Sequence, residues 1–96
     1  MLNIFLVCYD IRDPKRLRRV FKAMRGFGDH LQLSVFRCEL SDANKVRMQT
    51  ALQPIIKHDE DQVLIFRLGP LDGTYTVQVD CLGLPYVPGE HEAIVV

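Results

Sequence analysis

The chain opens with an apolar run, Leu2–Tyr9, that is interrupted at Asn3 and stops at the charged residue Asp10. The run is far shorter than the ~20 residues needed to cross a bilayer. It has neither the basic flank nor the small-residue cleavage site of a signal peptide. A short run rich in Ile, Leu, Val and aromatic residues is typical of a central strand covered on both faces. Since a chain of 96 residues buries only a thin core, we expect helices to cover one face and a second copy of the chain to cover the other.

A helix is predicted directly after this strand. Asp13 is a suitable N-cap, Pro14 suits the first helical position, and Gly26 ends the pattern. The apolar residues in between recur at helical spacing and predict one buried stripe: Leu17, Val20, Phe21 and Met24.

The remaining pattern predicts a mixed sheet of the ferredoxin-like kind. Leu31–Leu40 has strand composition, and its pattern leaves open whether it forms one bent strand or two short ones. Ser41 suits the N-cap of a second helix, which Pro54 should end early. Three further segments have strand character: Val63–Leu68, Thr74–Leu82 and Ala93–Val96, the last on this sheet or on a partner's. The order predicts one α+β domain, residues 1–96, a ferredoxin-like βαββαβ sandwich with an additional C-terminal strand.

The formal net charge of zero hides a division along the chain. Residues 1–58 contain eleven basic and five acidic side chains, a net charge of +6, and residues 59–96 carry −6. Such asymmetry suggests an anionic partner for the first part.

The first helix carries most of this positive charge on one face. No acid interrupts the helix between Lys15 and Arg25, and Arg16 lies on the flank. Cations spread over a helix about 15 Å long suit a phosphate backbone better than a compact metabolite. The cationic residues opposite the apolar stripe are Lys15, Arg18, Arg19, Lys22 and Arg25.

Asp10 is the candidate for metal chemistry because it stands where a central strand ends. On local grounds alone, a single Asp after a strand is more often a turn or capping residue. A single carboxylate is a poor magnesium site, but a two-fold axis near the strand end would bring together Asp10 of two chains, which could share one Mg²⁺ ion.

A third candidate is the segment Ser34-Val35-Phe36-Arg37. Ser34 could bond a phosphate or leaving group, Phe36 could pack or stack on a base, and Arg37 could bind phosphate. Each also fits a plain strand.

The three cysteines, Cys8, Cys38 and Cys81, have no metal-site spacing and indicate reduced thiols in a cytoplasmic protein.

Several of these residues together resemble the CRISPR-associated small endonuclease family, the second, non-integrase subunit of the spacer-acquisition complex in antiviral defence. The resemblance covers nearly the whole chain. It rests on Val7-Cys8-Tyr9-Asp10-Ile11, on Arg16 and Arg19, on Gln32–Phe36 followed by Cys38-Glu39-Leu40, and on Asp61-Gln62-Val63 through Leu68-Gly69 with Leu82-Gly83. Arg37-Cys38 is a departure, since a Glu and a small residue often follow the Phe.

This resemblance implies a ferredoxin-like homodimer in which the strand-end Asp residues, here Asp10, meet at the interface. Members of the family are described as magnesium-dependent endonucleases that act on RNA, on DNA, or on neither detectably. If this chain is such an enzyme, Asp10 of both chains would hold the metal, which activates water, and Arg16, Arg19 and Ser34 would orient the phosphate. The resemblance also implies an integrase partner, and a C-terminal strand, residues 92–96, that crosses to the partner chain.

Two other functions fit the same residues. In one, the dimer is a non-catalytic scaffold that binds double-stranded DNA through the basic helix, while Asp10 is structural. In the other, a ferredoxin-like regulatory dimer binds a small anion, which does not explain the extended basic face.

Overall fold

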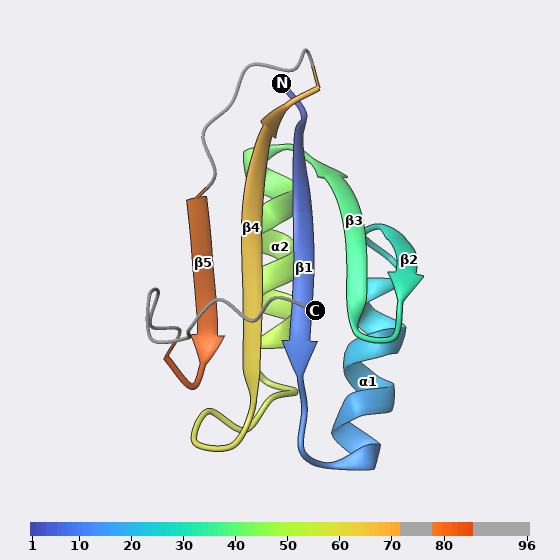
Figure 1. Cartoon of the computed structure of the whole chain (residues 1–96), viewed down its shortest axis with the longest axis vertical. Helices are drawn as coiled ribbons and strands as arrows, with labels where there is room; N and C mark the ends of the chain where they lie inside the picture. Colours follow the sequence, from blue (N-terminus) through green and yellow to red (C-terminus); the bar gives the residue numbers. More distant parts are fainter. Residues whose placement is uncertain (72–77, 86–96) are drawn as a thin grey trace, which may run out of the picture.

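The computed structural model, described for residues 1–71 and 78–85, has an antiparallel sheet with both helices on one face (Figure 1). Figure 1 shows α2 behind β1 and β4, and α1 on the side of β2 and β3. The strand order is β2-β3-β1-β4-β5, with every neighbouring pair antiparallel. This confirms the α+β, ferredoxin-like prediction, with β5 added beside β4. The elements are β1 Asn3–Asp10, α1 Pro14–Met24, β2 Asp29–Gln32, β3 Val35–Leu40, α2 Asp42–Leu52, β4 Gln62–Pro70 and β5 Gln78–Gly83.

Both helices begin at the predicted capping residues. The Asp13 carboxylate accepts a hydrogen bond from the backbone N–H of Arg16 at 3.0 Å. The Ser41 hydroxyl accepts one from the backbone N–H of Asn44 at 3.2 Å. Each bond satisfies an N–H group that would otherwise lack a partner in the first helical turn.

The segment with an open strand assignment forms two strands. β2 begins at Asp29, earlier than predicted, and pairs with β3 across a turn at Leu33 and Ser34. Leu33 has a φ of 32°, a backbone conformation that residues with a β-carbon seldom adopt. This tight reversal turns the chain back along itself and places Ser34 beside the end of β1.

The core lies between the helices and one face of the sheet. Phe5, Val7 and Tyr9 of β1 are buried there, whereas the alternate residues Ile4, Leu6 and Cys8 on the other face are only half-buried. That second face is the one we predicted a partner chain to cover. The helical residues packed against the sheet are Val20, Met24, Met48 and Leu52. In the predicted helical stripe, Leu17 departs from the pattern, since it is 37% exposed.

Some predictions fall outside the described residues. The predicted strand Thr74–Leu82 corresponds to β5 from Gln78 onward, and residues 74–77 are not among those described. Ala93–Val96, and with it the exchange of residues 92–96 between chains, also lies outside them. Within the described ranges, neither helix is long and apolar enough to cross a membrane.

Candidate functional site

Asp10 occupies the last position of β1 and is exposed. Its backbone pairs in register with Gln62, the first residue of β4. Among residues 1–71 and 78–85, no hydrogen bond or ion pair engages its carboxylate, and no group of three or more His, Cys, Asp or Glu side chains could hold a metal ion. Within these limits, one chain offers a single free carboxylate at this strand end.

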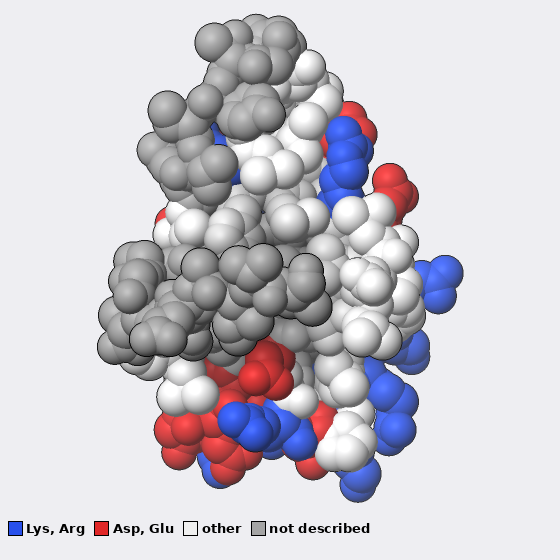
Figure 2. Space-filling model, in the orientation of Figure 1, with Lys and Arg blue, Asp and Glu red and all other residues white. Residues whose placement is uncertain are grey.

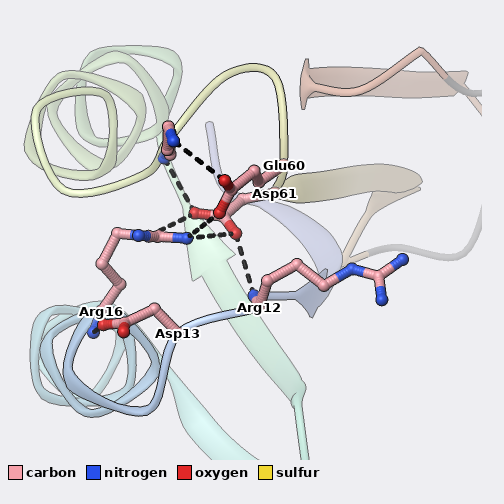
Figure 3. A network of polar contacts seen from close by, with 6 residues as sticks. Arg12, Asp13, Arg16, Glu60 and Asp61 are labelled. Carbon is pink, nitrogen blue, oxygen red and sulfur yellow. Dashed lines mark hydrogen bonds and ion pairs between the residues drawn. The ribbon is translucent and has the colours of Figure 1, made fainter.

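Asp61, in the loop between α2 and β4, is the centre of a polar network next to this strand end (Figure 3). Its side chain is completely buried. One oxygen, Oδ1, accepts the backbone N–H of Arg12 at 2.9 Å. The other, Oδ2, accepts the Arg16 Nε–H and the backbone N–H of Lys57, both at 2.8 Å. The network therefore fixes the loop after β1 to the loop before β4.

The network determines the charge state of Asp61. Burial alone would raise the pKa of this carboxyl, but the hydrogen bonds from Arg16 and from the backbone N–H groups of Lys57 and Arg12 outweigh it and hold the pKa at about 2. Glu60 accepts charged hydrogen bonds from Lys57 at 2.8 Å and Arg16 at 3.0 Å, which lower its pKa. Asp61 is therefore a permanent anion at neutral pH.

The end of β5 is also held by Asp61. The Asp61 carbonyl accepts the backbone N–H of Leu84 at 2.8 Å. Gly83 precedes that contact with a φ of +91°, and a β-carbon there would lie 2.0 Å from the Asp61 carbonyl oxygen. Only glycine fits this approach, so the end of β5 is also tied to Asp61.

This network was not predicted from the sequence, in which Asp59-Glu60-Asp61 has the pattern of an acidic turn. A local signal existed: the turn is the densest acidic cluster in the chain, and the helix after β1 offers the cations to meet it. What the pattern could not show is which cation turns toward it.

Arg16 was predicted to bind a phosphate, and the structure gives it another role. Its Nε and Nη2 nitrogens are bonded to Asp61 and Glu60, so two of its three guanidinium nitrogens are used within the chain. These bonds raise the pKa of Arg16, the contact with Asp61 being the main cause. Phosphate binding by Arg16 stays a prediction, but stabilisation of the strand-end loops is what the geometry shows.

The segment Ser34–Arg37 is brought to the same end of the sheet only in part. The Tyr9 backbone N–H donates to the Ser34 carbonyl at 3.1 Å, which places the half-buried Ser34 next to the end of β1. Arg37 forms an ion pair with Glu39 at 2.8 Å on the sheet face away from the helices, opposite Leu6.

Of the two roles predicted for Phe36, packing or stacking on a base, the geometry agrees with packing, because its side chain is completely buried. Its ring centroid lies 6.2 Å from that of Tyr9, 5.6 Å from Phe21 and 5.1 Å from His30. The alternation of β3 turns Phe36 toward the helices, so packing is its role.

The basic face of α1 is present as predicted. Blue side chains project along the lower right edge in Figure 2, where Figure 1 places α1, while red and blue lie together at the lower left. The fifth predicted cation, Arg25, lies over the Phe21 ring, with 5.9 Å from its guanidinium carbon to the ring centroid. Among the described residues no ion pair engages the other four: Lys15, Arg18, Arg19 and Lys22. We name these four residues the α1 cation face.

Comparison with known proteins identifies the family to which these features belong. Residues 3–72 match the family model described as "CRISPR associated protein Cas2". The chain belongs to the Cas2 family. The matched range contains Asp10, the α1 cation face and the Asp61 network, so every candidate feature lies within the shared part.

Individual relatives agree with this assignment. The chain is 42% identical over 96 residues to the "CRISPR-associated endoribonuclease Cas2" of Geobacter sulfurreducens, covering all of both chains. It is 39% identical over 94 residues to "CRISPR-associated endoribonuclease Cas2 1" of Rhodospirillum rubrum, covering 98% of this chain and 91% of that one. The crystal structure of Streptococcus pyogenes Cas2 is similar with a TM-score of 0.61 at 34% identity, over 65% of this chain and 81% of that one. These matches confirm the family predicted from the sequence.

Proposed function

We propose that this Cas2-family chain is a CRISPR-associated endonuclease that hydrolyses phosphodiester bonds as a homodimer, with one Mg²⁺ held between the Asp10 residues of two chains. The relatives from Geobacter and Rhodospirillum carry the name endoribonuclease, which supports RNA as a substrate. Nucleic acid is therefore the proposed partner, and an integrase subunit of the acquisition machinery is the proposed protein partner.

The observation that carries this proposal is the difference between Asp10 and its acidic neighbours. Asp13 caps α1 and Asp61 accepts four hydrogen bonds from three residues, so both are occupied by the fold. Asp10 is exposed, and within the described residues its carboxylate is bonded to nothing. A carboxylate that the fold does not use, on a strand end that the fold fixes firmly, is available for a ligand.

The donor set suits magnesium only when two chains contribute. Mg²⁺ takes oxygen ligands and usually keeps several waters beside one or two carboxylates. The two Asp10 carboxylates would supply those protein ligands. A bound Mg²⁺ ion would polarise the phosphoryl group and lower the pKa of a coordinated water.

The residues around Asp10 would hold the substrate in place. Cations of the α1 cation face would bind the phosphate backbone, and Arg19 among them would orient the phosphate as predicted. Ser34 lies beside the end of β1 and would donate its hydroxyl hydrogen to a phosphate oxygen. Arg16 would act through Asp61, by keeping the loop after Asp10 in position.

A second function, a non-catalytic scaffold for duplex DNA, is favoured by a different observation. The four cations of the α1 cation face extend along one helix and are exposed, and such a row suits a long backbone without any chemistry at Asp10.

Cleavage assays separate the two functions. Labelled single-stranded RNA and duplex DNA are incubated with Mg²⁺ and the parent chain, Asp10→Asn, or the matched control Asp29→Asn, another exposed aspartate. We expect the parent and Asp29→Asn to cut in a Mg²⁺-dependent manner and Asp10→Asn to lose at least about 100-fold in rate while still binding. Full cutting by Asp10→Asn would contradict the nuclease proposal, and inactivity of all three with duplex binding retained would favour the scaffold.

A further inference from the structure

A groove of about 710 Å³ lies between α1 and the turn that joins β2 to β3. This volume is in the range of sites that enclose a small organic ligand. Its apolar wall is made by Leu17, Phe21 and Leu33, and the buried Tyr9, which is 7% exposed, also contributes to the lining. Two of these are exposed leucines: Leu17 at 37% and Leu33 at 85%.

Leu33 is held at the edge of this groove by backbone geometry. Its φ of 32° is unfavourable for a residue with a β-carbon, and its carbonyl lies 2.7 Å from Nε2 of the His30 ring. A glycine or asparagine would suit the turn better and would leave no apolar surface. The fold therefore places a large apolar side chain in solvent at the one point of the turn where it costs stability.

The edge of the groove is cationic and contains no acid. The α1 cation face lines it in two helical rows, Lys15 with Arg19 and Arg18 with Lys22. Within each row the two side chains are four residues apart, about 6 Å along the helix axis. None has an ion-pair partner in the described part of the chain. An occupant that contacts the whole lining must therefore combine an apolar body with negative charge directed at α1.

We propose that this groove binds the base of an unpaired nucleotide, with the flanking phosphates on the α1 cation face. The inference rests on the proposed function and extends it from contacts with the backbone to contacts with a base. Aromatic and apolar walls within a basic groove are how proteins hold single strands without reading their sequence. A base inside a duplex does not expose its faces, so the groove selects unpaired strands, frayed ends or overhangs.

Continuity with the candidate site favours a nucleic acid over an acidic peptide as the occupant. Tyr9 lines the groove and directly precedes Asp10, and Ser34, also in the lining, is bonded to Tyr9 through the backbone. A strand whose base lies in the groove would have its neighbouring phosphates close to the end of β1. A small inorganic anion would use the cations but would leave the apolar wall without a contact.

Binding of intact and abasic strands tests the proposal directly. Short labelled single strands of DNA and of RNA, with bases or with abasic sites in their place, are titrated with the chain in the absence of divalent metal. We expect the intact strands to bind about tenfold more tightly than the abasic ones. Equal binding of DNA and RNA would assign the recognition to base and phosphate alone, whereas a preference for RNA would add the 2′-hydroxyl to it.

Two matched variants locate the effect. Leu33→Asn introduces a residue that tolerates the turn conformation and removes the Leu33 side chain from the apolar wall. It should reduce the preference for intact strands at least about threefold. Leu31→Asn changes another exposed leucine of the same hairpin, which does not line the groove, and should keep the full preference. Blunt duplex should bind all three proteins equally.

The outcomes distinguish this inference from the proposed function. Equal affinity for intact and abasic strands, with duplex binding and Asp10-dependent cleavage retained, would overturn the groove and leave the nuclease standing. Failure to bind any nucleic acid would overturn both. A third outcome concerns an acidic, leucine-containing peptide as the probe. If it bound the parent chain but not Leu33→Asn, and intact strands bound no more tightly than abasic ones, the groove would belong to a protein partner and the inference would be overturned.

Discussion

The two sides of α1 carry the same kinds of residue and use them differently. On one side, Arg16 is only 21% exposed and is bonded to the buried Asp61 and to Glu60. On the other, the α1 cation face is exposed and within the described residues has no acidic partner. The first arrangement binds the chain to itself, and the second leaves charge for a ligand. A cation on a helix is thus informative about binding only when its partners are known.

This difference also explains the division of charge along the sequence. Acidic residues late in the chain neutralise cations early in it: Glu60 and Asp61 contact Arg16, and Asp80 contacts Lys45. Part of the +6 of residues 1–58 is therefore met within the fold. The unmatched remainder is concentrated on α1, which is why an anionic partner is still expected there.

The largest effect on stability is expected for Asp61, the centre of the network that binds Arg16. Asp61→Ala removes an acceptor for three residues and leaves Arg16 without its main partner, which should cost about 3–5 kcal/mol of unfolding free energy. Urea denaturation measures it. Asp59→Ala, an exposed acid in the same turn, is the control and should cost under about 0.5 kcal/mol. Similar values for the two variants would mean that the network does not hold the loops.

Acid should reduce the contribution of the Asp61 network to the unfolding free energy. Asp61 has a pKa of about 2, lowered from an ordinary 3.8. A carboxyl whose folded pKa is depressed adds stability above its unfolded pKa and loses it as pH falls toward the folded value. We therefore expect about 2 kcal/mol attributable to Asp61 to disappear between about pH 5 and pH 2.

The comparison with Asp61→Asn isolates this contribution from those of the other acids. Unfolding free energies of the parent chain and the variant, measured across that pH range, should converge as pH falls. A constant gap between the two curves would show that the charge of Asp61 is not what stabilises the network.

The elements of the fold could be predicted because their signals are local. The apolar run before Asp10, the caps Asp13 and Ser41 and the break at Pro54 each act within a few residues. The reversal at Leu33 could not be predicted, because leucine is a poor residue for a φ of 32° and the pairing of β2 with β3 imposes it. Tertiary contacts decide such positions.

The positions of the candidate site residues were predictable where they depend on place along the chain. Asp10 and the α1 cation face follow from a strand end and a helical period. The role of Arg16 does not, because Asp61 is 45 residues away and nothing near Arg16 in the sequence identifies it. To predict that Phe36 is buried, one must know which alternate residues of β3 face the helices. That depends on the residue at which the strand begins.

Two variants test whether the cations of α1 divide into one structural residue, Arg16, and binding residues such as Arg19. Duplex binding at several salt concentrations and unfolding free energy are measured for Arg16→Ala and Arg19→Ala. We predict that Arg19→Ala lowers the log–log salt slope by about 0.9 and changes stability by under about 0.5 kcal/mol. Arg16→Ala should cost about 1–3 kcal/mol of stability while keeping the parent's salt slope. The reverse pattern, or the same pair of effects in both variants, would contradict the account.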